Sequence, residues 1–213
     1  MNNGNIVLGI TWFAQKHYII IFDINKKILF YSHAKSQYAD DIYAEINYLF
    51  KKKQFNIKKI KYIALTYNVK SFTDIRIYYS IAYSLAQVLN AKIIDVNILD
   101  VMIEYFSKEN NNSNTPMVPC IFTNKKNTIY CYKKNNYILL ENINKLKYNI
   151  KIIFQVDEKY VKNKKNIYLI DNKSKYIKTF IKTIINAILE NKYYSKDKIF
   201  PHYIETIKFK KIK

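Results

Sequence analysis

Acidic residues at the ends of predicted strands are the first candidates for chemistry in this 213-residue chain. Asp23 and Asp95 each fall at the end of a predicted strand, where some folds use carboxylates to hold a divalent metal ion and a phosphate group. The first predicted strand ends on Thr11, and a neutral hydroxyl does not replace the charged ligand that Mg²⁺ needs there. Taken alone, Asp23 and Asp95 fit turn or capping roles. The strand ends therefore predict no metal site.

Phosphate loops and activated nucleophiles are also missing. The sequence contains neither GxxxxGKS nor GxGxxG, and its two glycines are Gly4 and Gly9. Such loops need glycine because the backbone must approach the phosphate closely. His17, His33 and His202 have no suggestively placed serine or cysteine, so surface or hydrogen-bonded roles are expected for them. We expect no catalytic residue and no cofactor.

The two cysteines fit a cytoplasmic protein. Cys120 and Cys131 would lie opposite each other if a hairpin turns at residues 125–126, so a cross-strand disulfide is conceivable, although reduced buried thiols are the expectation in the cytoplasm. No CxxC pair is present, and no zinc site is predicted. The apolar stretches are shorter than the roughly 18 residues of a membrane span, and the N-terminus lacks a secretion signal. We expect a cytoplasmic location and no membrane contact.

The net charge of +20 has two explanations. Lysines and 21 tyrosines would suit an RNA-binding protein, through phosphate and stacking contacts. However, Arg76 is the only arginine among 36 basic residues, whereas proteins that read nucleic acid favour arginine. The abundant Lys, Asn, Ile and Tyr all have A/T-rich codons, so drift of the genome's base composition explains the charge as well. Drift predicts scattered lysines, and RNA binding predicts lysines gathered on one face.

Three predicted strands open the chain, and helices and strands then alternate. Periodicity and turn signals give strands at 6–11, 17–23, 27–32, 62–66 and 92–96, and helices at 37–52, 71–90 and 97–107. This order is that of the ribonuclease-H-like half of actin-like and sugar-kinase (ASKHA) folds, an α/β class with mixed sheets flanked by helices.

The second half reads as a shorter copy of the first. A polar linker at 108–116 separates a first lobe, 1–107, from a smaller second lobe, 117–213. Strands are predicted near 118–123, 128–132, 137–140, 152–155 and 167–170, with a short helix near residue 143, a long helix at 174–190 and a basic tail at 196–213. The sequence thus predicts a two-lobed fold.

The helix at 71–90 carries the most specific pattern. Ser71 is a good N-cap, and Asp74 complements the positive end of the helix dipole. One stripe is apolar. A second stripe of mostly small, polar residues is flanked by two tyrosines. Counted with these tyrosines, the second stripe consists of Arg76, Tyr79, Ser80, Tyr83, Ser84 and Gln87. Small residues four apart let a partner helix approach closely, and tyrosine is enriched at interfaces. A solvated face is the alternative.

The same segment resembles the TsaB (YeaZ) family, the dimerisation subunits of the bacterial machinery that adds threonylcarbamoyl to tRNA adenosine. The matching block is SFTxxR, from Ser71 through Phe72 and Thr73 to Arg76, and Asn68 stands in the preceding loop, where the family has glycine. Residues 6–22 and 200–211 resemble the family's first hairpin and its C-terminal segment.

This resemblance implies a non-catalytic scaffold. The helices at 37–52 and 71–90 would dock on a TsaD-like catalytic subunit, which works with a TsaE-like ATPase, or on a second copy of the chain. The expected interface adds Ile42 and Tyr43 to the second stripe, with tRNA contact indirect or weak. Arg76 would clamp a partner carboxylate, or else form an ion pair within the chain with Asp74 or Glu45. A degenerate sugar-kinase or peptidase-like enzyme is a rival, and it requires converging carboxylates.

Overall fold

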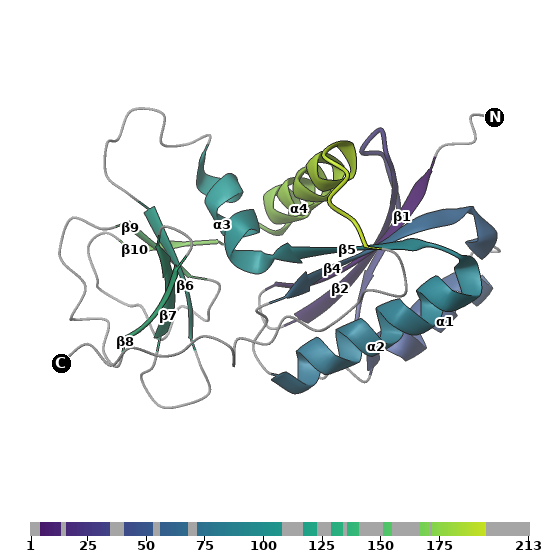
Figure 1. The fold of residues 1–213 in the computed structure, drawn as a ribbon, viewed down its shortest axis with the longest axis horizontal. Helices are drawn as coiled ribbons and strands as arrows, with labels where there is room; N and C mark the ends of the chain where they lie inside the picture. The colour runs from purple at the N-terminus through teal and green to yellow at the C-terminus, as the bar shows by residue number, and fades with distance from the viewer. Residues whose placement is uncertain are drawn as a thin grey trace.

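The protein consists of two five-stranded mixed sheets and four α-helices over the residues described (Figure 1). This computed structural model describes residues 5–13, 16–34, 41–52, 56–67, 72–107, 117–122, 129–133, 136–140, 151–154, 167–170 and 172–194. No helix among them is long and apolar enough to cross a membrane.

The first sheet has the strand order β3-β2-β1-β4-β5. Its strands are β1 (Ile6–Phe13), β2 (Lys16–Asp23), β3 (Ile28–His33), β4 (Ile60–Tyr67) and β5 (Lys92–Asn97). β2 pairs antiparallel with β1 and β3, whereas β4 runs parallel to β1 and β5. All eight residues of β1 are buried, as expected for a central strand with both faces covered.

Helices cover the two faces of this sheet. α1 (Asp41–Lys52) and α2 (Phe72–Leu89) lie on one face, and α4 (Lys173–Leu189) lies on the other, beside α3 (Ile98–Ser107) (Figure 1). A short 3-10 helix, η1 (Ile57–Lys59), precedes β4. The long helices pack through apolar stripes, such as Tyr78, Ala82 and Ala86 of α2.

Gly9 allows α4 to approach β1 closely. A Cβ atom at this position would lie 2.8 Å from a ring carbon of Phe180, a distance that side chains do not tolerate. The ring of Phe180 is fully buried there. The glycine is therefore explained by helix packing on the sheet rather than by a phosphate loop.

The second sheet repeats the topology of the first. Its order is β10-β9-β6-β7-β8, which from the other edge is third, second, first, fourth, fifth, as in the first sheet. The strands are β6 (Met117–Phe122), β7 (Ile129–Lys133), β8 (Asn136–Leu140), β9 (Lys151–Phe154) and β10 (Ile167–Leu169). Cys120 pairs with Cys131, so the predicted hairpin register is confirmed.

The predicted order of elements is confirmed for the described residues, with ends that differ by a few residues. α4 comes from the predicted second lobe in sequence, yet it packs on β1 and β5 of the first sheet. The N-cap residue Ser71, the linker, the short helix near residue 143 and the basic tail lie outside the described residues. The lobe boundaries stay a prediction.

Candidate functional site: the outer face of α1 and α2

The outer sides of α1 and α2 make up the candidate site, which we call the α1–α2 face. It consists of the exposed residues Tyr43, Tyr48, Arg76, Ser80, Tyr83, Ser84 and Gln87. Both helices lie on the same side of the sheet, because Glu45 of α1 accepts a hydrogen bond from Ser32 and Tyr78 of α2 contacts His17. Ser32 and His17 share one face of the sheet according to the strand register.

Three tyrosines give this face its area. Tyr43, Tyr48 and Tyr83 are 62%, 49% and 45% exposed. α2 also exposes two small residues, Ser80 and Ser84, and the Ser84 hydroxyl donates to the Ser80 carbonyl at 2.8 Å. The face therefore combines small polar residues with large side chains that have polar tips, and tyrosine is enriched at protein interfaces.

The charge of the α1–α2 face differs from that of the rest of the chain. α2 contains no lysine in 18 residues, and the lysines of α1 are confined to its last two positions. α4, which has nearly the same length, carries four lysines. If drift of base composition alone placed the lysines, the exposed positions of α2 should have received them as well. Drift alone therefore does not predict this distribution of lysines.

Two predicted interface residues are buried instead, which corrects the prediction. Tyr79 is 4% exposed, and its hydroxyl donates to Asp95 of β5 at 2.5 Å. Ile42 is fully buried on the sheet side of α1, in the same stripe as Ile46 and Leu49. Neither side chain can contact a partner while the helices keep these positions.

The segment matching the family motif is only partly described. Asn68 and Ser71 lie outside the described residues, Phe72 is the first residue of α2, and Thr73 is exposed at its start.

Buried polar contacts fix α2 against the sheet. His17 Nδ1 and the Tyr78 hydroxyl are 2.6 Å apart, and both residues are fully buried. Burial, followed by the nearby charge of Asp74, raises the pKa of Tyr78 well above the usual tyrosine value. Together with the bond from Tyr79 to Asp95, this contact sets which side of α2 faces outward.

Buried hydroxyl groups pack around Thr11, near the end of β1. Thr66 donates to Thr11 at 3.3 Å, Thr11 lies 2.9 Å from the Tyr176 hydroxyl, and that hydroxyl donates to the Trp12 carbonyl at 3.1 Å. All four residues are buried. A chain of neutral hydroxyls that satisfy one another is not suited to a divalent metal ion or a triphosphate.

The carboxylates do not converge on this strand end. Asp23 pairs with Ile6, at the opposite end of β1, and accepts from the backbone N–H of Lys27 in a turn. Asp95 lies beside Leu65 on the face toward α2, whereas Thr11 faces α4. Asp23 takes the turn role that was its alternative in the sequence, whereas Asp95 is neither a turn residue nor a cap and instead holds the Tyr79 hydroxyl from within β5. In the part of the chain that the structure describes, no three His, Cys, Asp or Glu side chains gather.

Some features of the α1–α2 face were missed in the sequence. Tyr48 is exposed on α1, and Val88 is 79% exposed near the end of α2. The buried stripe of Ile42, Ile46 and Leu49 leaves position 48 on the outer side of α1, so helical periodicity could have identified Tyr48. Nothing in the sequence indicated that Tyr176, over 160 residues away, would cover Thr11.

Comparisons with known proteins identify a family and a fold. Residues 32–192, more than half of the chain, match the family model described as TsaD, tRNA N6-adenosine threonylcarbamoyltransferase. No curated protein sequence matches the chain.

Solved structures show the same fold. An uncharacterised Pseudomonas aeruginosa protein with similarity to peptidase YeaZ superposes with a TM-score of 0.68 at 11% identity, over 94% of this chain and 99% of the other. YeaZ from the same organism gives 0.66 at 11% identity, over 94% and 100%. The expected ASKHA-like α/β fold and the resemblance to the YeaZ proteins are thus confirmed.

Proposed function

This chain belongs to the TsaD family of tRNA N6-adenosine threonylcarbamoyltransferases, and we propose that it is a non-catalytic subunit that docks on a TsaD-like enzyme through the α1–α2 face. In this role it supports threonylcarbamoyl transfer to tRNA while the enzyme and a TsaE-like ATPase carry out the chemistry. The observation that supports the proposal most is the exposed outer side of α2, which is free of lysine in a chain of charge +20.

The shape and chemistry of this face suit a helix of a partner. Ser80 and Ser84 allow a backbone to approach α2 closely, and Tyr43, Tyr48 and Tyr83 can bury large areas with little loss of side-chain entropy. Arg76, exposed one turn before Ser80, can bind a partner carboxylate in bidentate geometry. The net positive charge of the chain would speed encounter with an acidic partner.

A lack of catalysis is supported by the strand end beside α4. The hydroxyls of Thr11, Thr66 and Tyr176 stand where an enzyme of this fold needs carboxylates, and Asp23 and Asp95 are held elsewhere. A degenerate sugar-kinase or peptidase-like enzyme would need acidic side chains that converge, and none do among the described residues.

Co-purification tests the proposal. Ser80→Arg places a long charged side chain at the centre of the α1–α2 face and should weaken association with a co-expressed TsaD-like subunit by on the order of 100-fold. Asn186→Arg adds the same side chain to an exposed position of α4, on the opposite face of the sheet, and should leave association unchanged. Thermal unfolding checks that both variants fold.

The possible outcomes distinguish docking on a TsaD-like subunit from self-association. Loss of a heterodimer in Ser80→Arg, with Asn186→Arg normal, supports the proposal. Loss of a homodimer alone would assign the face to self-association. Association of Ser80→Arg at wild-type strength with the TsaD-like subunit would contradict the docking face.

A further inference from the structure

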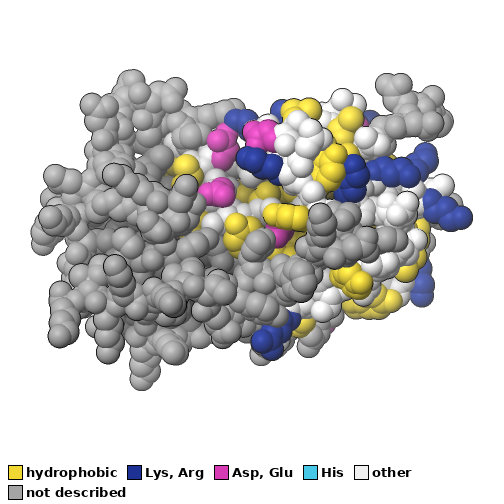
Figure 2. Space-filling view, viewed as in Figure 1, with side chains coloured by type: hydrophobic (Ala, Val, Ile, Leu, Met, Phe, Trp, Pro, Cys, Tyr) yellow, Lys and Arg dark blue, Asp and Glu magenta, His cyan; other side chains and the backbone are white. Residues whose placement is uncertain are grey.

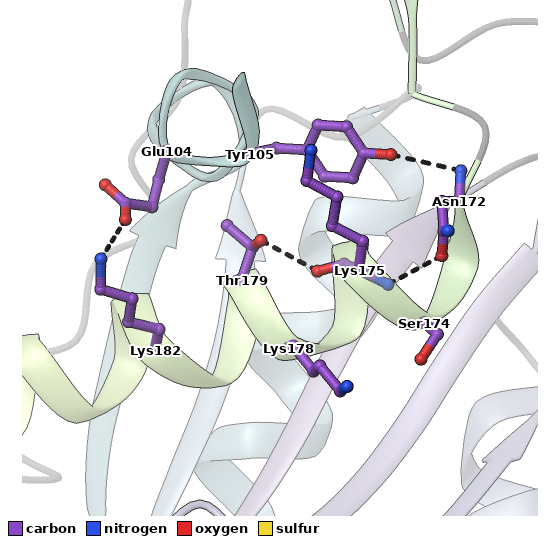
Figure 3. Close-up of a pocket in the computed structure, with 8 residues that line it drawn as sticks. All are labelled: Glu104, Tyr105, Asn172, Ser174, Lys175, Lys178, Thr179 and Lys182. Atoms are coloured by element: carbon purple, nitrogen blue, oxygen red, sulfur yellow. Dashed lines mark hydrogen bonds and ion pairs between the residues drawn. The ribbon is translucent and has the colours of Figure 1, made fainter. Parts of the chain in front are cut away.

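A second surface lies on the other side of the first sheet, where α3 meets the first half of α4. A pocket of about 340 Å³ opens there between the two helices. The row of three lysines along its α4 side, Lys175, Lys178 and Lys182, is named the α4 lysine row (Figure 3). The α3 side contributes Glu104 and Tyr105 (Figure 3). The volume is within the range of small-ligand sites.

The α4 lysine row is a concentrated positive charge. Its members are three and four residues apart, so they lie on one side of the helix and span about 10 Å along its axis. Like charges at this spacing repel one another. Burial is incomplete for all three side chains, so they can meet a ligand from solvent.

Two contacts hold lysines of this row against α3. Lys182 forms an ion pair with Glu104, and the Lys175 ammonium lies 4.1 Å from the centre of the Tyr105 ring (Figure 3). The pocket lining thus contains three lysines and one carboxylate. Figure 2 shows basic and acidic side chains next to one another on the side of the molecule that α3 and α4 occupy.

From this arrangement we propose that the α4 lysine row and its pocket bind phosphate groups of RNA. This inference rests on the proposed function, because the reaction of the family takes place on tRNA. Lysine binds phosphate as a point charge and does not offer the bidentate geometry with which arginine reads guanine. The surface therefore binds the RNA backbone without reading its sequence.

The position of the row leaves docking undisturbed. α4 covers the face of the sheet opposite to α1 and α2 (Figure 1). A partner seated on the α1–α2 face and an RNA seated on α4 would contact this chain from two sides. The lysines that are missing from α2 and gathered on α4 suit this division.

Glu104 gives the proposal a distinctive signature. Its carboxylate repels a phosphate and holds Lys182 in an ion pair. Glu104→Gln removes both effects and should tighten RNA binding about threefold. Glu190→Gln changes the net charge equally and also breaks an ion pair, with Lys192, but outside the pocket, so it should have little effect.

The experiment uses the full chain and a labelled, unmodified tRNA transcript, with fluorescence anisotropy measured between 50 and 200 mM salt. Lys175→Gln with Lys178→Gln should weaken binding about tenfold and reduce the slope of log affinity against log salt by about 1.5. Lys58→Gln with Lys59→Gln removes the same charge from exposed positions of η1 and should weaken binding less than about twofold.

Unequal effects of the two lysine pairs, together with tightening in Glu104→Gln alone, support the proposal. Equal effects of the two pairs, or equal tightening by the two glutamate variants, would mean that net charge alone holds the RNA, and would overturn it. These measurements need no partner protein, so a failure here is distinct from a failure of docking at Ser80.

Discussion

The Tyr176 hydroxyl lies 2.9 Å from Thr11 Oγ1, so the first turn of α4 covers the end of β1. The two residues are 165 positions apart in the chain. This contact joins the second half of the chain to the first and places neutral hydroxyls at this end of β1.

Tyr176→Phe removes one hydroxyl from this chain of donors. The Thr11 hydroxyl and the Trp12 carbonyl each lose a partner, and we expect the free energy of unfolding to fall by about 1–3 kcal/mol. Urea denaturation measures the change. Addition of Mg²⁺ and ATP should stabilise neither the variant nor the wild type, and a clear rise in melting temperature would contradict the assignment of this strand end as non-catalytic.

Because α4 packs closely on β1, even the smallest side chain at residue 9 should destabilise the fold. Gly9→Ala places a methyl group 2.8 Å from the Phe180 ring and should destabilise the fold by about 1–3 kcal/mol. Phe180→Leu should relieve the clash, so the double variant should lose less stability than the sum of the two single variants. Additive losses would show that the two positions are not coupled.

Alkaline pH should destabilise the protein through Tyr78. Burial raises the pKa of Tyr78 in the folded state above the value of about 10 in an unfolded chain, so the native state holds this proton more tightly. The sign follows from linkage: stability is unaffected below about pH 9 and falls as the pH rises through 10 toward the folded-state pKa.

Tyr78→Phe checks this explanation. The variant loses the contact with His17 and should be about 1–3 kcal/mol less stable near neutral pH, but its stability should decline less steeply above pH 10. Urea midpoints between pH 7 and 11 give the comparison. An identical alkaline decline in wild type and variant would assign the effect to other groups.

Two neighbouring residues of α1 allow the effect of a mutation on docking to be measured separately from its effect on stability. Tyr43 is exposed and Ile42 is fully buried. Tyr43→Ala should weaken association with the partner by about 1–2 kcal/mol and leave stability within about 0.5 kcal/mol. Ile42→Ala should destabilise the fold by about 2–5 kcal/mol through the cavity it leaves. Isothermal titration and denaturation measure the two quantities, and a stability loss in Tyr43→Ala as large as that of Ile42→Ala would contradict the assignment.

The fold was predictable because its signals are local. The nearly continuous apolar run of β1 and the helical stripes of α2 and α4 depend on near neighbours in sequence. The exposed serines of α2 follow from the same periodicity. The burial of Tyr79 did not follow from periodicity, because this residue lies at the border between the buried and exposed sides. Its inward orientation depends on Asp95 of a strand further along the chain.

Long-range contacts explain the other features that the sequence did not predict. The α3–α4 pocket brings Glu104 next to Lys182, and no periodicity in either helix indicates that pairing. Likewise the packing of Phe180 on Gly9 joins two residues whose neighbourhood only the folded chain defines. The lysine-free outer side of α2, by contrast, was present in the sequence and became informative once exposure was known.

Oxidative footprinting of tyrosines tests the docking face most directly. In the complex with the TsaD-like subunit, modification of Tyr43, Tyr48 and Tyr83 should slow severalfold. Tyr31 is similarly exposed and contacts Lys173 of α4 on the opposite face of the sheet, so it should keep its rate. Protection of Tyr31 with Tyr43, Tyr48 and Tyr83 unchanged would place the partner elsewhere and contradict the account.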